Sequence, residues 1–140
     1  MQWDEVVDAA TRSGWTTYLG TADAAGAPHV AVVAPGFTDG AVWFVTRASS
    51  KKLRNLRENA HVAFHWPVGN AEAPGELSAW GTATLHDSDD ARRRLWDAGI
   101  MPYDLSAFFG SPDDSDAVLV EVAVRRARLQ TQHAALVWTP

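Results

Sequence analysis

The residues best suited to chemistry lie in one turn, Ser49-Ser50-Lys51-Lys52, which we call the serine–lysine turn. It holds both lysines of the chain, and Gly40–Arg57 contains no acidic residue. A helix that begins here gains nothing from these lysines, because cations near its positive end are disfavoured by ~0.3–1 kcal/mol each. Free backbone N–H groups, hydroxyls and two ammonium groups together suit an anion, most often a phosphate. The turn therefore predicts a cofactor phosphate site. A capped surface helix with solvated charges is the alternative.

The elements around the turn come from hydrophobic periodicity. Ala41–Arg47 alternates as a strand leading into the turn, and Ser49 or Ser50 is the predicted N-cap of the helix that follows. Gly81, in the middle of an amphipathic strand, predicts a bulge or a close backbone approach. Met101–Ser115, called the aromatic segment below, is expected to be irregular, with a short helix near a pocket mouth. Other strands are predicted at Trp15–Thr21, His29–Ala34, Ala60–Trp66, Glu76–Leu85, Asp116–Val124 and Ala135–Trp138.

Two further helices are expected, at Gln2–Ser13 and from Ser88 to Gly99, and Pro67–Gly75 is expected to be a loop. His29–Ala34 is apolar at successive positions, which predicts a strand covered on both faces. About seven strands joined as meanders predict a mostly β fold: an antiparallel barrel with a few covering helices. The length of 140 residues suits one domain, 1–140.

Composition excludes several classes of function. The net charge of −5 argues against a nucleic-acid binder, which needs a broad basic face. With no cysteine, neither disulfide nor thiolate chemistry is possible. No apolar run approaches the ~20 residues of a membrane span, and the N-terminus lacks the pattern of a signal peptide. We expect a cytoplasmic protein without a membrane partner.

The sequence offers no second strong site. His61 and His65 share one face of a predicted strand, but no third ligand accompanies them, so no metal site is predicted. The Asp113–Asp116 run is expected to be a loop and cap. The phosphate-binding glycine loop GxxxxGK[ST], the dinucleotide-binding GxGxxG and the hydrolase GxSxG are all missing, and no catalytic residue can be named.

Three motifs, taken in order, give the chain a family resemblance. They are Trp43–Leu56 (WFVTRASSKKLRNL), Ala27–Val30 (APHV) and Ser78–Ala83 (SAWGTA). Together they resemble the pyridoxamine 5′-phosphate oxidase-like flavoproteins with the FMN-binding split barrel. The stretch from Leu95 to Leu119 is similar to the general stress protein 26 branch in particular. The resemblance implies an antiparallel split β-barrel that forms a homodimer with flavin at the interface.

The same resemblance implies roles for individual residues. Thr46, Ser50, Lys51 and Lys52 would bind the FMN phosphate, and Phe44 and Val45 would line the ribityl chain and ring. The ring would lie beside His29, Val30 and Ala31, and Glu76 and Ser78 would come from the partner subunit.

The activity that the resemblance implies is FMN-dependent hydride transfer to or from an unknown small substrate. The tail after Gln130 lacks the Arg/His motif of true pyridoxamine-phosphate oxidases, which argues against that substrate. Two alternatives stay open: an oxidoreductase that uses deazaflavin F420, and a flavin-binding stress protein without turnover.

Overall fold

The computed structural model describes residues 1–140, which form four helices and eight strands. The helices are α1 (Trp3–Arg12), α2 (Lys51–Glu58), α3 (Asp89–Asp97) and α4 (Ser106–Phe109). The strands are β1 (Thr17–Ala22), β2 (Pro28–Val33), β3 (Gly36–Thr38), β4 (Ala41–Arg47), β5 (His61–Gly69), β6 (Pro74–His86), β7 (Ala117–Thr131) and β8 (Ala135–Trp138).

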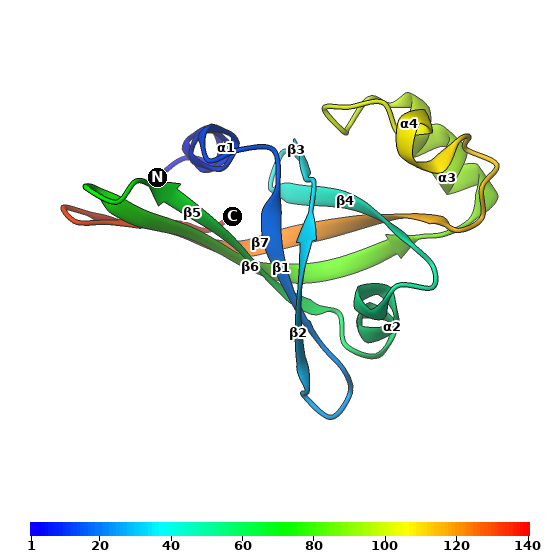
Figure 1. The fold of residues 1–140 in the computed structure, drawn as a ribbon, viewed down its shortest axis with the longest axis horizontal. Helices are drawn as coiled ribbons and strands as arrows, with labels where there is room; N and C mark the ends of the chain where they lie inside the picture. The colour runs from blue at the N-terminus through cyan, green and yellow to red at the C-terminus, as the bar shows by residue number, and fades with distance from the viewer.

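All strands belong to one antiparallel sheet, which confirms the predicted mostly β fold. Its order is β2-β1-β5-β6-β7-β4-β3, with β8 added beside β7. In Figure 1, α1 lies at the upper left and α2 at the lower right, α3 and α4 sit together at the upper right, and the β1–β2 hairpin projects at the bottom. The long β6–β7 pair forms the middle of the sheet, so β4 and the serine–lysine turn are attached to its most extensively paired part.

Gly81 confirms the predicted bulge and close approach. The β6–β7 register shifts between Trp80 and Gly81, where β7 carries one extra residue, Arg125. A Cβ on Gly81 would lie 2.3 Å from the Ala123 carbonyl oxygen, so no larger residue fits without movement. Past this bulge β7 continues to Thr131, well beyond the predicted end at Val124.

Two other predicted boundaries were wrong. The expected Pro67–Gly75 loop is mostly a hairpin, since β5 runs to Gly69 and β6 starts at Pro74. Asn70 makes the turn by accepting hydrogen bonds from the backbone N–H groups of Glu72 and Ala73, both at 2.9 Å. The short strand β3 was expected to be part of a turn, but its three residues pair with β4.

The prediction that β2 is covered on both faces was also wrong for this chain. The side chains of Val30 and Val32 are 67% and 56% exposed, while Val33 on the other face is 6% exposed. The reason is topological: β2 is an edge strand of a single sheet, and α2 packs only on its inner face.

The main core fills the inner face of the curved sheet, and both α1 and α2 contribute to it. Its members are Val6, Ala9, Ala10, Leu19, Val33, Val42, Phe44, Leu53, Leu56, Val62, Phe64, Trp66, Leu77, Ala79, Val118, Val120, Val122, Val124 and Ala127. A smaller cluster joins α3 and the aromatic segment to β4 through Leu95, Met101, Leu105 and Trp43. None of the helices has the length and apolar character needed to cross a bilayer.

Candidate functional site

The serine–lysine turn forms the capped start of α2. Ser50 is the N-cap, as predicted, and its Oγ accepts a hydrogen bond of 3.3 Å from the Leu53 backbone N–H. The same Oγ lies 3.0 Å from Oγ1 of Thr46 at the end of β4. The first turn of α2 contains no acidic residue. Two hydroxyls, the open helix N-terminus and two lysines therefore meet at one point, as an anion site requires.

Lys52 is the least conventional member of this group. It is half-buried, and burial lowers the pKa of its ammonium group below the ordinary value of 10.5. Neither lysine takes part in any of the five ion pairs of the chain. A half-buried ammonium without a carboxylate partner carries a desolvation cost that a bound anion would offset. Lys51, one residue earlier, is exposed.

Lys52 borders a cavity of about 350 Å³, which we call the Lys52 cavity. Its walls are mainly apolar and aromatic, and Arg47 and Lys52 are its charged residues. The remaining lining residues are Trp15, Thr16, Val32, Val33, Ala34, Val45, Tyr103, Phe108 and Phe109. The aromatic segment thus forms a short helix at a pocket wall, as predicted. A mostly apolar cavity with a few charged groups is typical of a small-molecule site.

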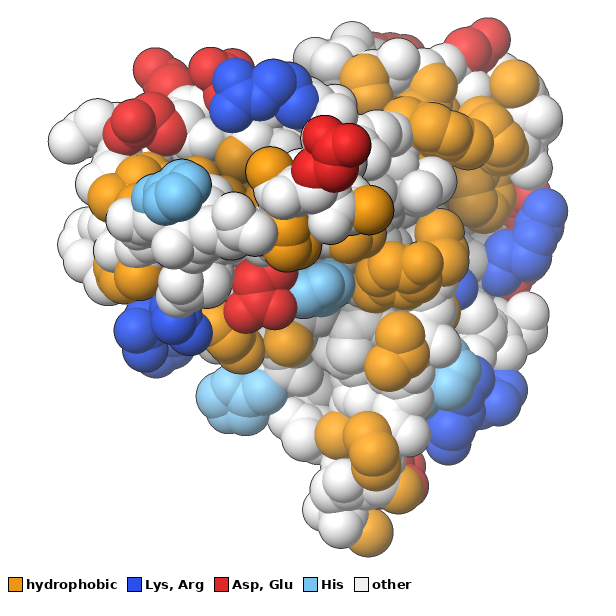
Figure 2. Space-filling view, turned by 60° about the vertical axis from the view of Figure 1, so that its left-hand side comes forward, with side chains coloured by type: hydrophobic (Ala, Val, Ile, Leu, Met, Phe, Trp, Pro, Cys, Tyr) orange, Lys and Arg blue, Asp and Glu red, His pale blue; other side chains and the backbone are white.

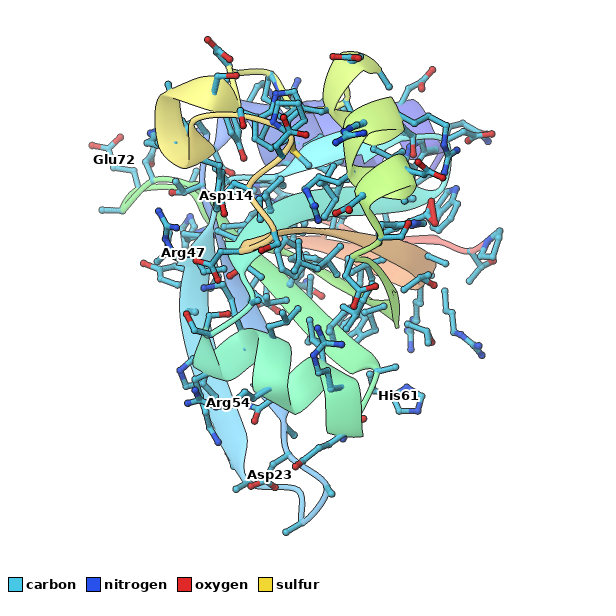
Figure 3. All side chains as sticks on the ribbon, turned by 90° about the vertical axis from the view of Figure 1, so that its right-hand side faces the viewer. Asp23, Arg47, Arg54, His61, Glu72 and Asp114 are labelled. Carbon is cyan, nitrogen blue, oxygen red and sulfur yellow. The ribbon has the colours of Figure 1, made fainter.

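Arg47 ties the aromatic segment to the end of β4. Its guanidinium donates to Asp116 Oδ2 at 3.0 Å and to the Phe108 carbonyl oxygen at 3.4 Å, and its Cζ lies 5.2 Å from the centre of the Phe109 ring. Figure 3 shows Arg47 between α2 and the aromatic segment. Arg47 is therefore neutralised by Asp116, which leaves Lys52 as the unpaired cation of the cavity.

Tyr103 holds the other side of this wall. Its hydroxyl donates a hydrogen bond of 3.0 Å to the Ala34 carbonyl oxygen, just after β2. Burial raises the pKa of the Tyr103 phenol, which keeps it a neutral donor. The bond connects residues 69 positions apart in the sequence, so the wall depends on a long-range contact.

The structure gathers some of the predicted site residues and separates others. Val45 and Lys52 line the cavity, whereas Thr46 and Ser50, whose hydroxyls lie 3.0 Å apart, are not among its lining residues. Phe44 differs: its side chain is fully buried in the core, 6.2 Å from the Phe64 ring, so only its backbone can face a ligand.

The three predicted residues of β2 are divided between its two faces. Val30 points outward and is exposed, whereas His29 and Ala31 lie on the inner face with Val33. The Nδ1 atom of His29 is buried without a hydrogen-bond partner. His29 pairs across the ladder with Thr21, whose hydroxyl accepts a 3.1 Å bond from Asn55 of α2. An unsatisfied ring nitrogen thus lies on the face that α2 covers.

The remaining sequence candidates contribute less. His65 and Ser78 lie on the outer face and approach each other to 3.3 Å, and Glu76 is exposed. The chain contains no group of three or more residues suited to a metal ion. Sequence reasoning had no role for Trp15, Arg47 or Tyr103 in the site. The one local signal for them was the density of aromatic residues in the aromatic segment.

Comparison with known proteins places the chain in a family. The family model described as pyridoxamine 5′-phosphate oxidase matches residues 4–131. The chain belongs to this family. The search of curated proteins finds no match. The split-barrel fold expected from the motifs is confirmed, and the solved structures that share it include relatives of general stress protein 26.

Three solved structures illustrate the fold. A heme-binding protein from Mycobacterium smegmatis is 20% identical to this chain, with a TM-score of 0.76. The match covers 96% of this chain and 57% of the mycobacterial chain. The chain thus spans little more than half the length of that protein. A protein from Clostridium acetobutylicum related to general stress protein 26 is 14% identical, with a TM-score of 0.74 and coverage of 99% and 96%. An FMN-binding protein from Nostoc punctiforme is 15% identical, with a TM-score of 0.67 and coverage of 100% and 97%. At these identities the likeness concerns the fold.

Proposed function

We propose that the protein binds FMN and transfers hydride between the flavin and a small substrate. The carrying observation is Lys52, a half-buried and unpaired ammonium group in the first turn of α2, a helix without acids there whose N-cap hydroxyl on Ser50 lies 3.0 Å from that of Thr46. A phosphate at this point would accept charge-assisted hydrogen bonds and satisfy the open helix end. Family membership and the FMN-binding Nostoc neighbour support the same cofactor.

The residues present fit the phosphate end of FMN. Lys51 and Lys52 would supply positive charge, and Thr46, Ser50 and the first N–H groups of α2 would supply hydrogen bonds. The unsatisfied Nδ1 of His29 is a further polar atom without a protein partner on the inner face of β2. When bound, the flavin supplies two-electron hydride chemistry, and the protein supplies binding, orientation and shielding from water.

The structure favours FMN over F420. The acidic tail of F420 is longer, so it would need more cationic side chains near the turn. The two arginines available for that purpose already have partners. Arg57 pairs with Asp87 at 3.3 Å, and Arg54 donates to the Ser49 carbonyl oxygen at 2.9 Å.

We further propose a homodimer with the flavin at its interface. Two rows of outward-facing residues cross β2, β1, β5 and β6, and Tyr18, Val30, Val32 and Trp80 in these rows are 40–67% exposed. Figure 2 shows hydrophobic side chains along the projecting β1–β2 hairpin at the bottom of the view and above it. An apolar patch of this kind on a sheet face is typical of an interface.

The test compares FMN with riboflavin, which lacks only the phosphate. The Lys51→Ala/Lys52→Ala variant is expected to bind FMN at least about 100-fold more weakly, since each charged contact contributes about 1.5–3 kcal/mol. Riboflavin binding is expected to stay within about twofold of the wild type. Both affinities can be measured by quenching of flavin fluorescence. Equal losses for the two ligands would show that the turn does not hold the phosphate.

Turnover and assembly need separate measurements. Anaerobic bleaching of the flavin band by NADPH would support an enzyme, and a bound flavin that no nicotinamide or F420 donor reduces would instead support a binding protein without turnover. Light scattering is expected to report a dimer for the wild type and a monomer for Tyr18→Glu, because Tyr18 is an exposed residue of these rows that lines neither the Lys52 cavity nor another part of the proposed phosphate site. A monomeric variant that retains full FMN affinity would contradict a flavin site shared between subunits.

A further inference from the structure

A second and larger cavity lies beside α1. It measures about 640 Å³, and we call it the α1 cavity. It is enclosed by α1, the α1–β1 connection, β3 and the start of the aromatic segment. Its lining residues are Val7, Ala10, Thr11, Gly14, Trp15, Pro35, Gly36, Phe37, Trp66, Ile100 and Pro102. The volume is in the range of cavities that enclose a small organic molecule.

The lining of the α1 cavity contains no ionisable side chain. Its one side-chain hydroxyl, on Thr11, already donates to the Val7 carbonyl oxygen at 2.9 Å. A charged ligand would lose its hydration in this cavity without gaining a polar partner, and the desolvation free energy would oppose its binding. An apolar ligand carries no such desolvation cost. The lining therefore selects for uncharged molecules, and Trp15, Phe37 and Trp66 offer aromatic faces for a ring.

The wall of the α1 cavity is fixed rather than loosely attached. A Cβ on Gly36 would lie 2.5 Å from the Ile100 carbonyl oxygen, so this glycine allows the aromatic segment to touch β3. Three residues further along, the Tyr103 hydroxyl donates a hydrogen bond to the Ala34 carbonyl oxygen. Met101 is buried between these two contacts. The cavity is thus held open by the fold itself, which reduces the cost of ordering it around a ligand.

Trp15 connects the two cavities, because its side chain lines both of them. The two cavities therefore adjoin at Trp15, so a molecule in the α1 cavity would be next to one in the Lys52 cavity. The Lys52 cavity, with its cation, is thus suited to an anionic cofactor. The α1 cavity, without charged residues, is suited to an apolar molecule.

We propose that the α1 cavity binds the substrate of the flavin reaction, and that this substrate is an uncharged, mainly apolar ring compound. The role as a substrate site rests on the proposed function, whereas binding of neutral ring compounds does not. Trp15 is then a specificity-determining residue, because it lines the junction at which the substrate would meet the flavin.

The test uses two dyes that differ by one charge. N-phenyl-1-naphthylamine is neutral, and 1-anilinonaphthalene-8-sulfonate is the same ring system with a sulfonate. The neutral dye is expected to bind the flavin-free full chain at one site. Ile100→Glu and Val7→Glu place a carboxylate on two different walls of the cavity, and each is expected to weaken its binding at least about tenfold. Leu136→Glu is the matched control, because Leu136 is an exposed apolar residue outside the cavity.

The outcomes separate this proposal from the proposed function. The sulfonated dye is expected to be insensitive to Ile100→Glu and Val7→Glu, since the cavity offers it no cation. Unchanged binding of the neutral dye in both variants, with loss in Tyr18→Glu, would place it on the exposed sheet face and overturn the proposal, since Tyr18 lines neither cavity. Circular dichroism identifies a variant that fails to fold. If one of the two wall variants does not fold, the other variant tests the proposal. FMN affinity of the folded variants is expected to be unchanged, so failure of either proposal leaves the other testable.

Discussion

Two helices of this chain begin with the same cap and opposite charges. In α2, Ser50 accepts from the Leu53 N–H at 3.3 Å, and in α3, Ser88 accepts from the Ala91 N–H at 3.2 Å. The cap is followed by Asp89 and Asp90 in α3 but by Lys51 and Lys52 in α2. Carboxylates in a first turn stabilise a helix and lysines there destabilise it.

The acids of α3 also take part in holding the fold together. Arg92 is 1% exposed, pairs with Asp89 and donates to the Pro112 carbonyl oxygen at 2.7 Å. Arg93 pairs with Asp113 in the aromatic segment at 2.6 Å. The lysines of α2 have no comparable partner within the chain. The charges of α3 thus stabilise the fold, whereas those of α2 stabilise nothing within the chain, which is what the proposed anion site requires.

The largest expected effect comes from exchanging these charges. Lys51→Asp/Lys52→Asp gives α2 the first turn of α3, and FMN affinity is expected to fall more than about 1,000-fold, because attraction for the phosphate becomes repulsion. Unfolding free energy is expected to change by less than about 1 kcal/mol, since the gain at the helix dipole opposes the burial of a carboxylate at position 52. Flavin titration and urea unfolding measure the two effects.

The reciprocal exchange in α3 serves as the control. Asp89→Lys/Asp90→Lys is expected to lower the unfolding free energy by about 2–5 kcal/mol, because it leaves the buried Arg92 without its carboxylate and reverses the dipole interaction. FMN affinity of the folded fraction is expected to be unchanged. A loss of FMN affinity in this variant alone would mean that the two helix ends are not functionally different.

A smaller effect separates the two caps. Ser50→Ala and Ser88→Ala are each expected to cost ~0.5–2 kcal/mol of unfolding free energy, since each removes one N-cap acceptor. Only Ser50→Ala is expected to weaken FMN binding, by about tenfold, because its hydroxyl also faces Thr46 and the proposed phosphate. Thermal unfolding and flavin titration of the pair would reveal whether Ser50 is more than a cap.

Much of this site was predictable because its signals are local. The serine cap, the absence of acids and the strand before the turn lie within Ala41–Arg57, and the structure confirms all three. The bulge at Gly81 was also visible, since a glycine inside a strand implies a close backbone approach. Local chemistry thus predicted the cap and the acid-free first turn on which the proposed anion site rests.

The other half was not predictable, because it depends on contacts between distant residues. The bond from Tyr103 to Ala34 and the contact of Arg47 with Asp116 each connect positions 69 residues apart. The inward orientation of Phe44 follows from where β4 sits in the sheet, not from its alternation alone. The exposure of β2 likewise depends on its being an edge strand, which no local pattern specifies.

The smallest expected effect is a dependence of stability on pH that is carried by Lys52. Its pKa in the folded protein lies below 10.5, so between those two values the unfolded chain binds more protons than the folded one. Unfolding free energy is therefore expected to rise with pH in that window, relative to a Lys52→Met variant that lacks the group. The difference is expected to stay below about 1 kcal/mol, since the side chain is only half-buried.

Taking the difference between wild type and variant matters because Tyr103 acts in the opposite direction. Its raised pKa makes the folded state bind more protons than the unfolded state above pH 10.0, so its contribution falls as pH rises. Saturating FMN is expected to remove the Lys52 slope, since a bound phosphate favours the charged lysine and raises its pKa. Urea unfolding at several pH values, with and without FMN, measures this. A slope that FMN leaves unchanged would mean that Lys52 does not face the phosphate.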